Sequence, residues 1–224
     1  TTGTMLYPNN NTFETLSFWF GTGRVFSYDW TQLTDWIYLS HSGQMKGQFG
    51  YGITLFAEDE FYKNILFEDN YGLEISFEKS FSKSISFEIK PKFGTEIIRV
   101  DAPYQARNTG IALGIELKPS DEFKLNFRID QSKSIRFEND EVVYSDMIAR
   151  ARFEYQATTF LNFRLVAQYH RYYDTFDIQP LISYQPGPFS IFYFGTSRSY
   201  DTSFPGWEES YGQIYLKVQK LFSF

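Results

Sequence analysis

The chain has 224 residues with no cysteine and a net charge of −6, and 21% of its residues are aromatic and another 21% charged. The missing cysteines exclude disulfides and thiolate metal sites, and the negative charge argues against a nucleic-acid partner, because phosphate binding needs a basic surface. No stretch reaches the roughly 18 to 20 consecutive apolar residues of a membrane-spanning helix, which excludes a helical membrane protein. The composition has no internal break, so we expect one domain over residues 1–224.

The first residues, 1–4, show neither the basic nor the apolar segment of a secretory signal. We therefore expect a mature chain or the tail of a longer one. Beyond them, apolar and polar residues alternate with a period of two, which predicts strands. Twelve strands are predicted, near 12–20, 33–41, 46–56, 71–79, 84–92, 109–118, 123–131, 145–156, 161–171, 176–185, 189–198 and 210–222. The segment from Gly21 to Thr34 has room for a further pair.

The connections between these strands alternate in length. Short turns are predicted at 41–45, 79–83, 118–122, 156–160 and 185–188. Longer, more polar connections are predicted near 57–70, 93–108, 131–144 and 199–209. Short turns at one end and long loops at the other are typical of outer-membrane β-barrels, whose strands need only about 9 to 11 residues. The pattern therefore predicts an all-β fold, an antiparallel transmembrane barrel of about twelve strands.

Charged residues within the strands fall on the parity opposite to the apolar one. If the apolar parity faces lipid, these residues line the lumen, where ion pairs and water can hold them, whereas an outward Lys or Arg would cost about 2 to 4 kcal/mol at the bilayer midplane. The predicted lumen-lining set is Glu74, Glu78, Glu88, Lys90, Glu116, Lys118, Lys124, Arg128, Arg150, Arg152, Glu154 and Arg164. Most other acids lie in connections, where we interpret them as solvated loop tips; binding of divalent cations or basic partners is the alternative.

Sequence motifs for catalysis are missing: there is no HExxH, GxSxG, Walker A or paired-cysteine pattern. Ser40, His41 and Ser42 are the one Ser/His grouping, but neighbours on a strand point to opposite faces, so His41 is expected to lie apart from both serines. His170 is interpreted as a surface histidine among interfacial tyrosines. We predict no catalytic, cofactor-binding or metal-binding residue and no cofactor, and an enzyme is the less favoured reading.

The last predicted strand carries an apolar row of Leu216, Val218, Phe222 and Phe224. An amphipathic run that closes on an aromatic resembles the C-terminal strand of bacterial outer-membrane barrels. The resemblance implies that this strand is recognised by the barrel-assembly machinery. It departs from the usual insertion signal at Val218, where a glycine is more common.

From about Gly72 onward the likeness is more particular. The runs 149–158, 161–169, 178–188 and 191–195 resemble the C-terminal β-barrel of large Gram-negative outer-membrane proteins that carry an N-terminal carbohydrate-binding-like module of family-nine type. The resemblance covers roughly the last two thirds of the chain and brings no catalytic residue with it. Because the module is missing here, it implies that this sequence is the C-terminal part of a longer polypeptide with a larger barrel.

Together these features predict an integral protein of the bacterial outer membrane that serves as a pore, a transport component or a structural subunit of an envelope complex. Its expected partners are outer-membrane lipid, lipopolysaccharide and other envelope proteins, and no nucleic acid. Two alternatives stay open. One is an outer-membrane hydrolase with a site at the barrel rim, and the other is a soluble β-barrel or sandwich binding protein whose apolar parity would be buried.

Overall fold

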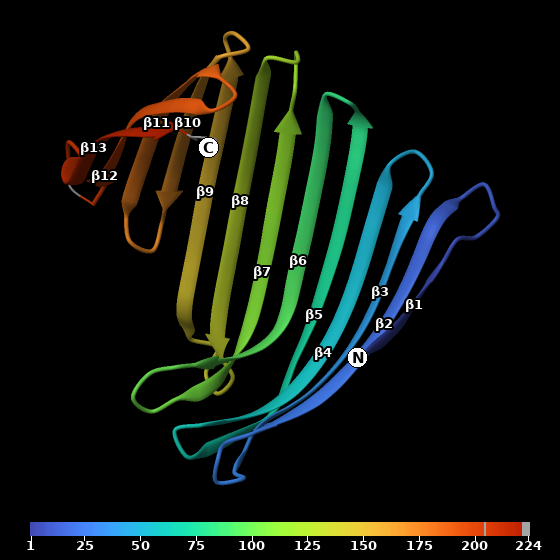
Figure 1. Ribbon diagram of the computed structural model, residues 1–224. Helices are drawn as coiled ribbons and strands as arrows, with labels where there is room; N and C mark the ends of the chain where they lie inside the picture. The colour runs from blue at the N-terminus through green and yellow to red at the C-terminus, as the bar shows by residue number, and fades with distance from the viewer. Residues whose placement is uncertain (204, 221–224) are drawn as a thin grey trace. The chain divides into compact units, whose positions relative to one another are not determined.

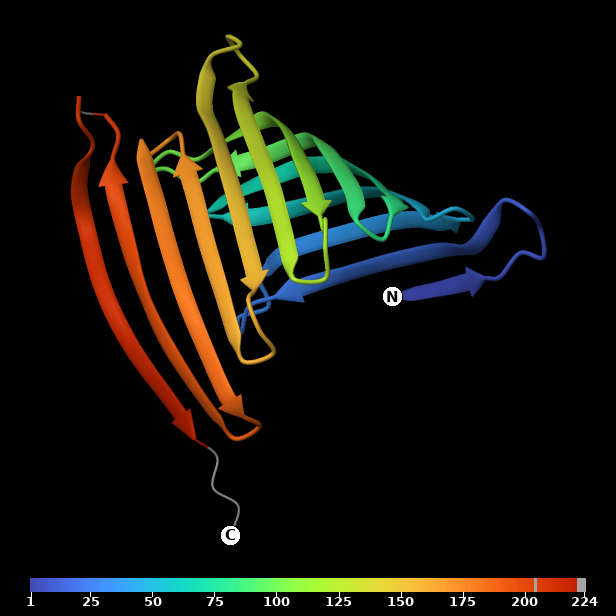
Figure 2. The same cartoon turned by 90° about the horizontal axis from the view of Figure 1, so that it is seen from above.

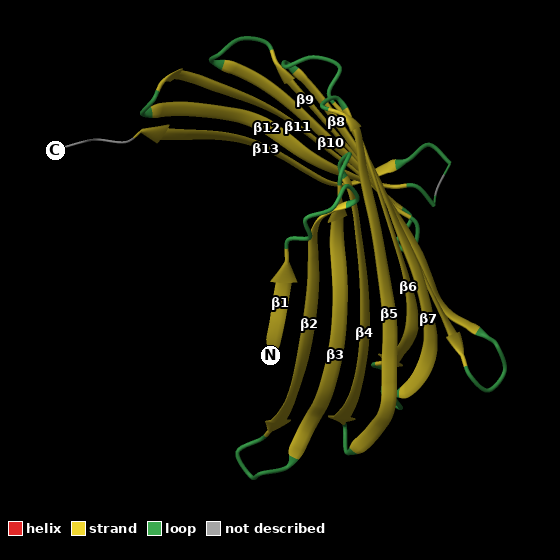
Figure 3. Cartoon of the chain, turned by 90° about the vertical axis from the view of Figure 1, so that its right-hand side faces the viewer, coloured by secondary structure: helices red, strands yellow, loops and turns green. Residues whose placement is uncertain are grey.

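A computed structural model describes residues 1–203 and 205–220, and its regular structure is entirely β (Figure 3). Thirteen antiparallel strands form one sheet in sequence order (Figure 1). They are β1 (Thr2–Leu6), β2 (Phe13–Phe26), β3 (Gln32–Met45), β4 (Phe49–Tyr62), β5 (Ile65–Ser82), β6 (Ile85–Ile98), β7 (Tyr104–Leu117), β8 (Phe123–Arg136), β9 (Val142–Gln156), β10 (Leu161–His170), β11 (Thr175–Gly187), β12 (Ser190–Asp201) and β13 (Glu208–Lys220). The described residues contain no helix long and apolar enough to cross a membrane.

All twelve predicted strands are present, and the thirteenth is β1, which pairs with β2 from Thr2 opposite Phe20 to Leu6 opposite Leu16. The sequence gives little sign of β1, because its five residues include a glycine and two threonines and show no alternation. No extra pair lies between Gly21 and Thr34: β2 continues to Phe26, and β3 starts at Gln32.

The predicted contrast between short turns and long loops is wrong. The segment 57–70 is almost all strand, with a two-residue turn at Lys63 and Asn64 that joins β4 to β5. The predicted turn at 41–45 belongs to β3, and the chain reverses at 46–48, where Gly47 has a φ of 83°. The strands extend beyond the residues that alternate in polarity. The polar segments next to those residues also pair across strands, as Asp35 does with Asp59. The connections have two to six residues where long loops were predicted and two to five where short turns were predicted.

The chain divides into two compact units, which we describe separately. The first comprises Thr1–Phe81, Phe87–Leu113 and Gln131–Ser145, and the second comprises Ser82–Ser86, Gly114–Asp130 and the chain from Asp146 onward. The first thus contains β1 to β5 with parts of β6 to β9. The second contains β10 to β13, which run side by side (Figure 2), with the remaining parts of β6 to β9.

In the first unit the registers align one apolar and one polar face. Leu39 lies between Phe20 and Leu55, and Leu55 lies opposite Leu73. This apolar face of β2 to β5 comprises Leu16, Phe18, Phe20, Ile37, Leu39, Met45, Phe49, Tyr51, Ile53, Leu55, Ala57, Tyr71, Leu73, Ile75 and Phe77, together with His41 and Gly43. On the polar face, Ser40 lies opposite Thr54. The polar face of β2 to β5 comprises Ser17, Trp19, Gly21, Gly23, Trp36, Tyr38, Ser40, Ser42, Gln44, Gly50, Gly52, Thr54, Phe56, Glu58, Gly72, Glu74, Ser76 and Glu78.

The second unit has the same two-faced organisation. The apolar face of β9 to β12 aligns Phe153, Leu165 and Pro180 in one row and Tyr155, Phe163 and Ile182 in the next. The opposite parity carries Arg150, Arg152, Glu154, Arg164, Gln168 and Asp177. The predicted assignment of apolar and charged residues to opposite parities is therefore present in both units.

These apolar faces are uncovered. Leu39 and Leu55 are each about half exposed, at 53% and 50%, and so are Phe194 at 54% and Tyr184 at 47%. Within the described residues the buried hydrophobic side chains are Phe67, Ala106 and Val166 alone. A soluble sandwich of this size buries one face of every strand, whereas many residues of both apolar faces are exposed here.

A repeated glycine–aromatic pairing shapes the sheet. Six strand glycines lie directly opposite an aromatic residue whose ring covers them, so that an added Cβ would lie within 2.2 to 2.7 Å of the ring. The pairs are Gly3 with Trp19, Gly21 with Tyr38, Gly23 with Trp36, Gly43 with Tyr51, Gly72 with Phe56 and Gly195 with Tyr215. The rings restore the packing that a strand glycine lacks.

Candidate functional site

The Ser/His grouping does not form a catalytic pair. His41 lies on the apolar face, where its Nε2 is 2.8 Å from the Tyr51 hydroxyl and its ring stacks on Phe18 at 4.3 Å. Ser40 lies on the other face, 3.0 Å from the Thr54 hydroxyl. The expected separation is confirmed, and it removes the sequence feature that favoured a hydrolase.

Many of the predicted lumen-lining charges form ion pairs. Lys118 and Lys124 both contact Glu116, at 3.1 and 2.8 Å, and Lys90 pairs with Glu88. Lys118 lies in the turn just after β7. Arg152 pairs with Glu154 two residues along the same strand.

Two further pairs involve partners that the sequence reasoning missed. Glu74 is 3.2 Å from Lys92, and Arg128 is 2.7 Å from Asp130. Both partners continue the charged parity of their own strands, so the alternation alone could have identified them. Of the remaining members, Arg164 lies directly opposite Glu154, Arg150 opposite Gln168, and Glu78 opposite Gly50.

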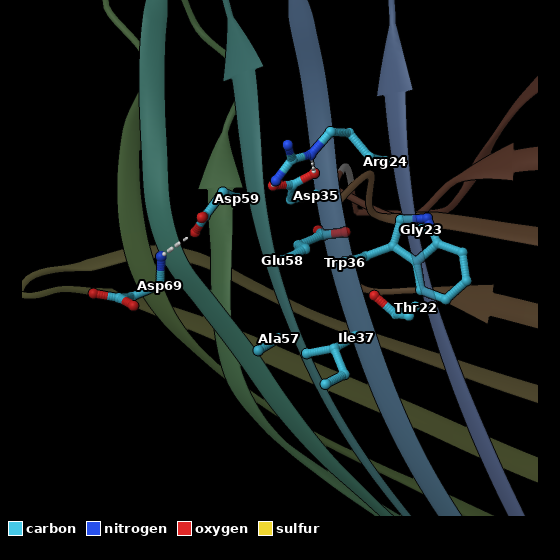
Figure 4. A pocket seen from close by; sticks show the side chains of 10 residues that line it. All are labelled: Thr22, Gly23, Arg24, Asp35, Trp36, Ile37, Ala57, Glu58, Asp59 and Asp69. Atoms are coloured by element: carbon cyan, nitrogen blue, oxygen red, sulfur yellow. Dashed lines mark hydrogen bonds and ion pairs between the residues drawn. The ribbon is translucent and has the colours of Figure 1, made fainter. Parts of the chain in front are cut away.

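Beyond the apolar rows of the first unit, the same face becomes charged (Figure 4). Arg24 makes a bidentate pair with Asp35, and the next strand presents Asp59, whose carboxylate accepts a hydrogen bond of 2.9 Å from the Asp69 amide. The pocket here has a volume of about 510 Å³. In the adjoining loop 27–31, hydrogen bonds from Ser27 and Thr31 lower the pKa of Asp29.

The acidic segments predicted as loop tips lie largely in strands and pair with arginines. Glu60 is 2.8 Å from Arg99, and Glu209 is 3.2 Å from Arg198. Among residues 1–203 and 205–220, no three His, Asp or Glu side chains are grouped so that they could hold a metal ion.

His170 is not the surface residue that we expected. Its side chain is 15% exposed, its Nε2 lies 3.1 Å from Asp146, and its ring stacks on Tyr173 at 4.7 Å. Asp146 also accepts a hydrogen bond of 3.1 Å from the Tyr172 amide. The pair therefore fixes the turn between β10 and β11.

The polar face of β2 to β5 contains a second hollow, with a volume of about 380 Å³. The residues that line it include the small side chains of Ser17, Ser42 and Ser76 and the longer ones of Gln44 and Glu78. The aromatic rings over Gly3, Gly21, Gly23 and Gly72 share this face. Sequence reasoning missed this combination because it depends on which residues lie opposite each other across the strands.

Of the predicted terminal insertion strand, Leu216 and Val218 lie in β13, opposite Phe194 and Phe192. Both are exposed, in line with the apolar face of their neighbours. Phe222 and Phe224 lie outside the described residues.

Comparison with known proteins gives no family or relative for this chain. A scan against models of protein families finds no match, and a search of curated proteins finds no similar sequence. The site must therefore be interpreted from its own chemistry.

Proposed function

We propose that this chain is an integral β-barrel protein of the bacterial outer membrane that acts as a pore, a transport component or a structural subunit of an envelope complex. The observation that carries the proposal is the uncovered apolar face. On β10 it runs from Leu161 to Tyr169, about nine residues, and on β3 from Ile37 to Met45, the same length. A tilted strand needs about 9 to 11 residues to cross a bilayer.

The edge of this face supports the same proposal. Past Ile37 and Ala57 the next row on the same face is Asp35 with Asp59, and Arg24 lies beside them. A transmembrane barrel has an outer apolar band of limited height, flanked by polar and aromatic residues. An apolar surface that binds another protein would not need stretches of the same length, about nine residues, in both units.

In this proposal the charged parities face the lumen and the apolar parities face lipid and lipopolysaccharide. Within each unit the ion pairs, such as Glu116 with Lys124, lower the cost of charges on a partly wet wall. The apolar row of β13 would contact the barrel-assembly machinery, and other envelope proteins are further expected partners. Membership of the Gram-negative family with an N-terminal family-nine-type module stays a prediction of the sequence resemblance.

Two neighbouring substitutions test the orientation. Leu39→Arg places a charge in the middle of the apolar face, whereas Ser40→Arg places the same charge one residue away on the polar face. We expect Leu39→Arg to destabilise the barrel by about 2 to 4 kcal/mol or to prevent its insertion, with Ser40→Arg much milder. The measurement is the fraction of protein that runs as the compact form in unheated SDS and the temperature at which this form is lost.

Wild-type protein that dissolves without detergent and shows no heat-dependent change in mobility would contradict the proposal. Equal effects of the two arginines would contradict the assignment of faces. Conductance in planar bilayers then separates a pore from a plugged or structural barrel, because only a pore gives steps of current.

A further inference from the structure

We propose that the polar face of β2 to β5 binds a neutral oligosaccharide. The binding surface consists of an aromatic strip, defined as Trp19, Trp36 and Tyr38, and of the small polar residues in the rows beside it. The inference goes beyond the proposed function, and rests on it only in taking this face as the one in contact with water.

The rings of the strip lie flat on the sheet. A Cβ built on Gly21 would be 2.3 Å from the Tyr38 ring, and one built on Gly23 would be 2.6 Å from the Trp36 ring, as the position of Trp36 over β2 illustrates (Figure 4). The rings of Trp36 and Tyr38 are nearly parallel, at 15°. A ring that covers the backbone with one side turns its other side away from the sheet, where it can stack on a ligand, and Trp19 is 44% exposed.

The strip is longer than a single sugar ring. Trp19 lies in the row of Ser40, and Trp36 lies four residues along β3 from Ser40. At about 3.3 Å per residue this separation is about 13 Å along the strand. Tyr38 occupies the row between them, and the rings of Trp19, Tyr38 and Trp36 lie over Gly3 of β1 and over Gly21 and Gly23 of β2. These three rings therefore form a track along neighbouring strands, which suits a chain of sugars better than one small planar molecule.

Hydrogen-bonding groups lie next to the track. Ser40 and Thr54 lie in the row of Trp19, and Ser42 and Ser76 follow in the next row. Their short side chains leave the hollow of about 380 Å³, which Gln44 also lines. A sugar presents an apolar C–H face to a ring and hydroxyl groups at its edge. A surface that offers both aromatic rings and hydroxyl groups therefore matches both parts of the sugar.

The charges on this face select against ionic ligands. The carboxylates of Glu58, Glu74, Glu78 and Glu88 outnumber the ammonium groups of Lys90 and Lys92, so a phosphate or carboxylate ligand would be repelled. The position for a cation is already filled: the Lys92 Nζ lies 5.8 Å from the centre of the Phe56 ring and 3.2 Å from Glu74. A neutral ligand meets neither obstacle.

Binding can be measured on the purified full chain in a detergent without a sugar headgroup. The probes are three neutral hexasaccharides, of α-1,4-glucose, β-1,4-glucose and β-1,4-N-acetylglucosamine, with hexagalacturonate as the anionic probe and tetramethylammonium as the cationic one. The readouts are titration calorimetry and tryptophan fluorescence. We expect saturable binding of at least one neutral hexasaccharide, at least about tenfold tighter than either charged probe.

Variants locate the site. Trp36→Leu removes one ring of the track, and Ser42→Leu fills part of the hollow. Each substitution should weaken binding by about tenfold or more. Trp30→Leu, in the loop 27–31, is the control and should leave binding unchanged. Each variant is first checked for the compact form in unheated SDS. Protein that passes this check yet binds no neutral hexasaccharide, or binds a charged probe more tightly, overturns the inference and leaves the membrane proposal intact. Failure of the wild type in the SDS check overturns the membrane proposal itself.

Discussion

At the scale of single residues, the glycine–aromatic pairs show how a strand can use a missing side chain. A glycine in a strand normally weakens it, since nothing packs above the backbone. Here the neighbouring ring fills that space, as Tyr38 does over Gly21 and Phe56 over Gly72. The pair is a unit: the ring can lie flat only because the opposite residue has no Cβ.

Gly21→Val should therefore destabilise the protein. The added Cβ would meet Tyr38 ring atoms 2.3 Å away, and the strain of overpacking is typically about 1 to 3 kcal/mol. The measurement is the temperature at which the compact form is lost. Gly187→Ala is the matched control, because nothing lies within 4 Å of the Cβ built there. If the double variant Gly21→Val with Tyr38→Ala is no more stable than Gly21→Val alone, the ring contact is not the cause.

At the scale of elements, alternation predicted where the strands lie but not where they end. The runs around Leu73 and Leu165 were recognised because their two parities differ in polarity. The tip of β4 and β5 was not, because neighbours such as Glu58 and Asp59 are polar on both parities and resemble a loop. Pairing across strands, which a single sequence does not display, holds these tips in the sheet. The same limit hid β1, which is recognised only by its pairing with β2.

The turn between β4 and β5 offers a test at this scale. Lys63 and Asn64 have φ values of 49° and 62°, which are the left-handed values of a tight hairpin turn. Asn64→Gly should be neutral or slightly stabilising, because both residues tolerate this conformation. Asn64→Val should destabilise the hairpin by about 1 to 2 kcal/mol, because a β-branched side chain resists a positive φ. The comparison is made by denaturant unfolding, and equal midpoints for the two variants would contradict the turn assignment.

At the scale of the whole chain, the distribution of apolar surface sets the conditions for folding. The sequence predicted the fold class and the two-faced strands, and it left the candidate sugar-binding face unseen, because that face depends on which residues lie opposite each other. Few hydrophobic side chains are buried in the described residues, while apolar rows of both units are exposed. Burial against the chain's own core is therefore small, and in the proposed barrel the apolar faces are covered by lipid or detergent.

Refolding from urea should consequently depend on an amphiphile. We expect chain diluted into detergent micelles or lipid vesicles to regain the compact, heat-sensitive form, and chain diluted into buffer alone to aggregate. Leu39→Arg should slow or block recovery in vesicles, because inserting the variant would carry a charge past the bilayer midplane, whereas Ser40→Arg should recover like the wild type. Circular dichroism in the far ultraviolet and SDS mobility report the outcome together. Recovery of stable, monomeric β structure in buffer alone would mean that the apolar faces find cover within the protein, and the assignment of those faces to lipid would then be wrong.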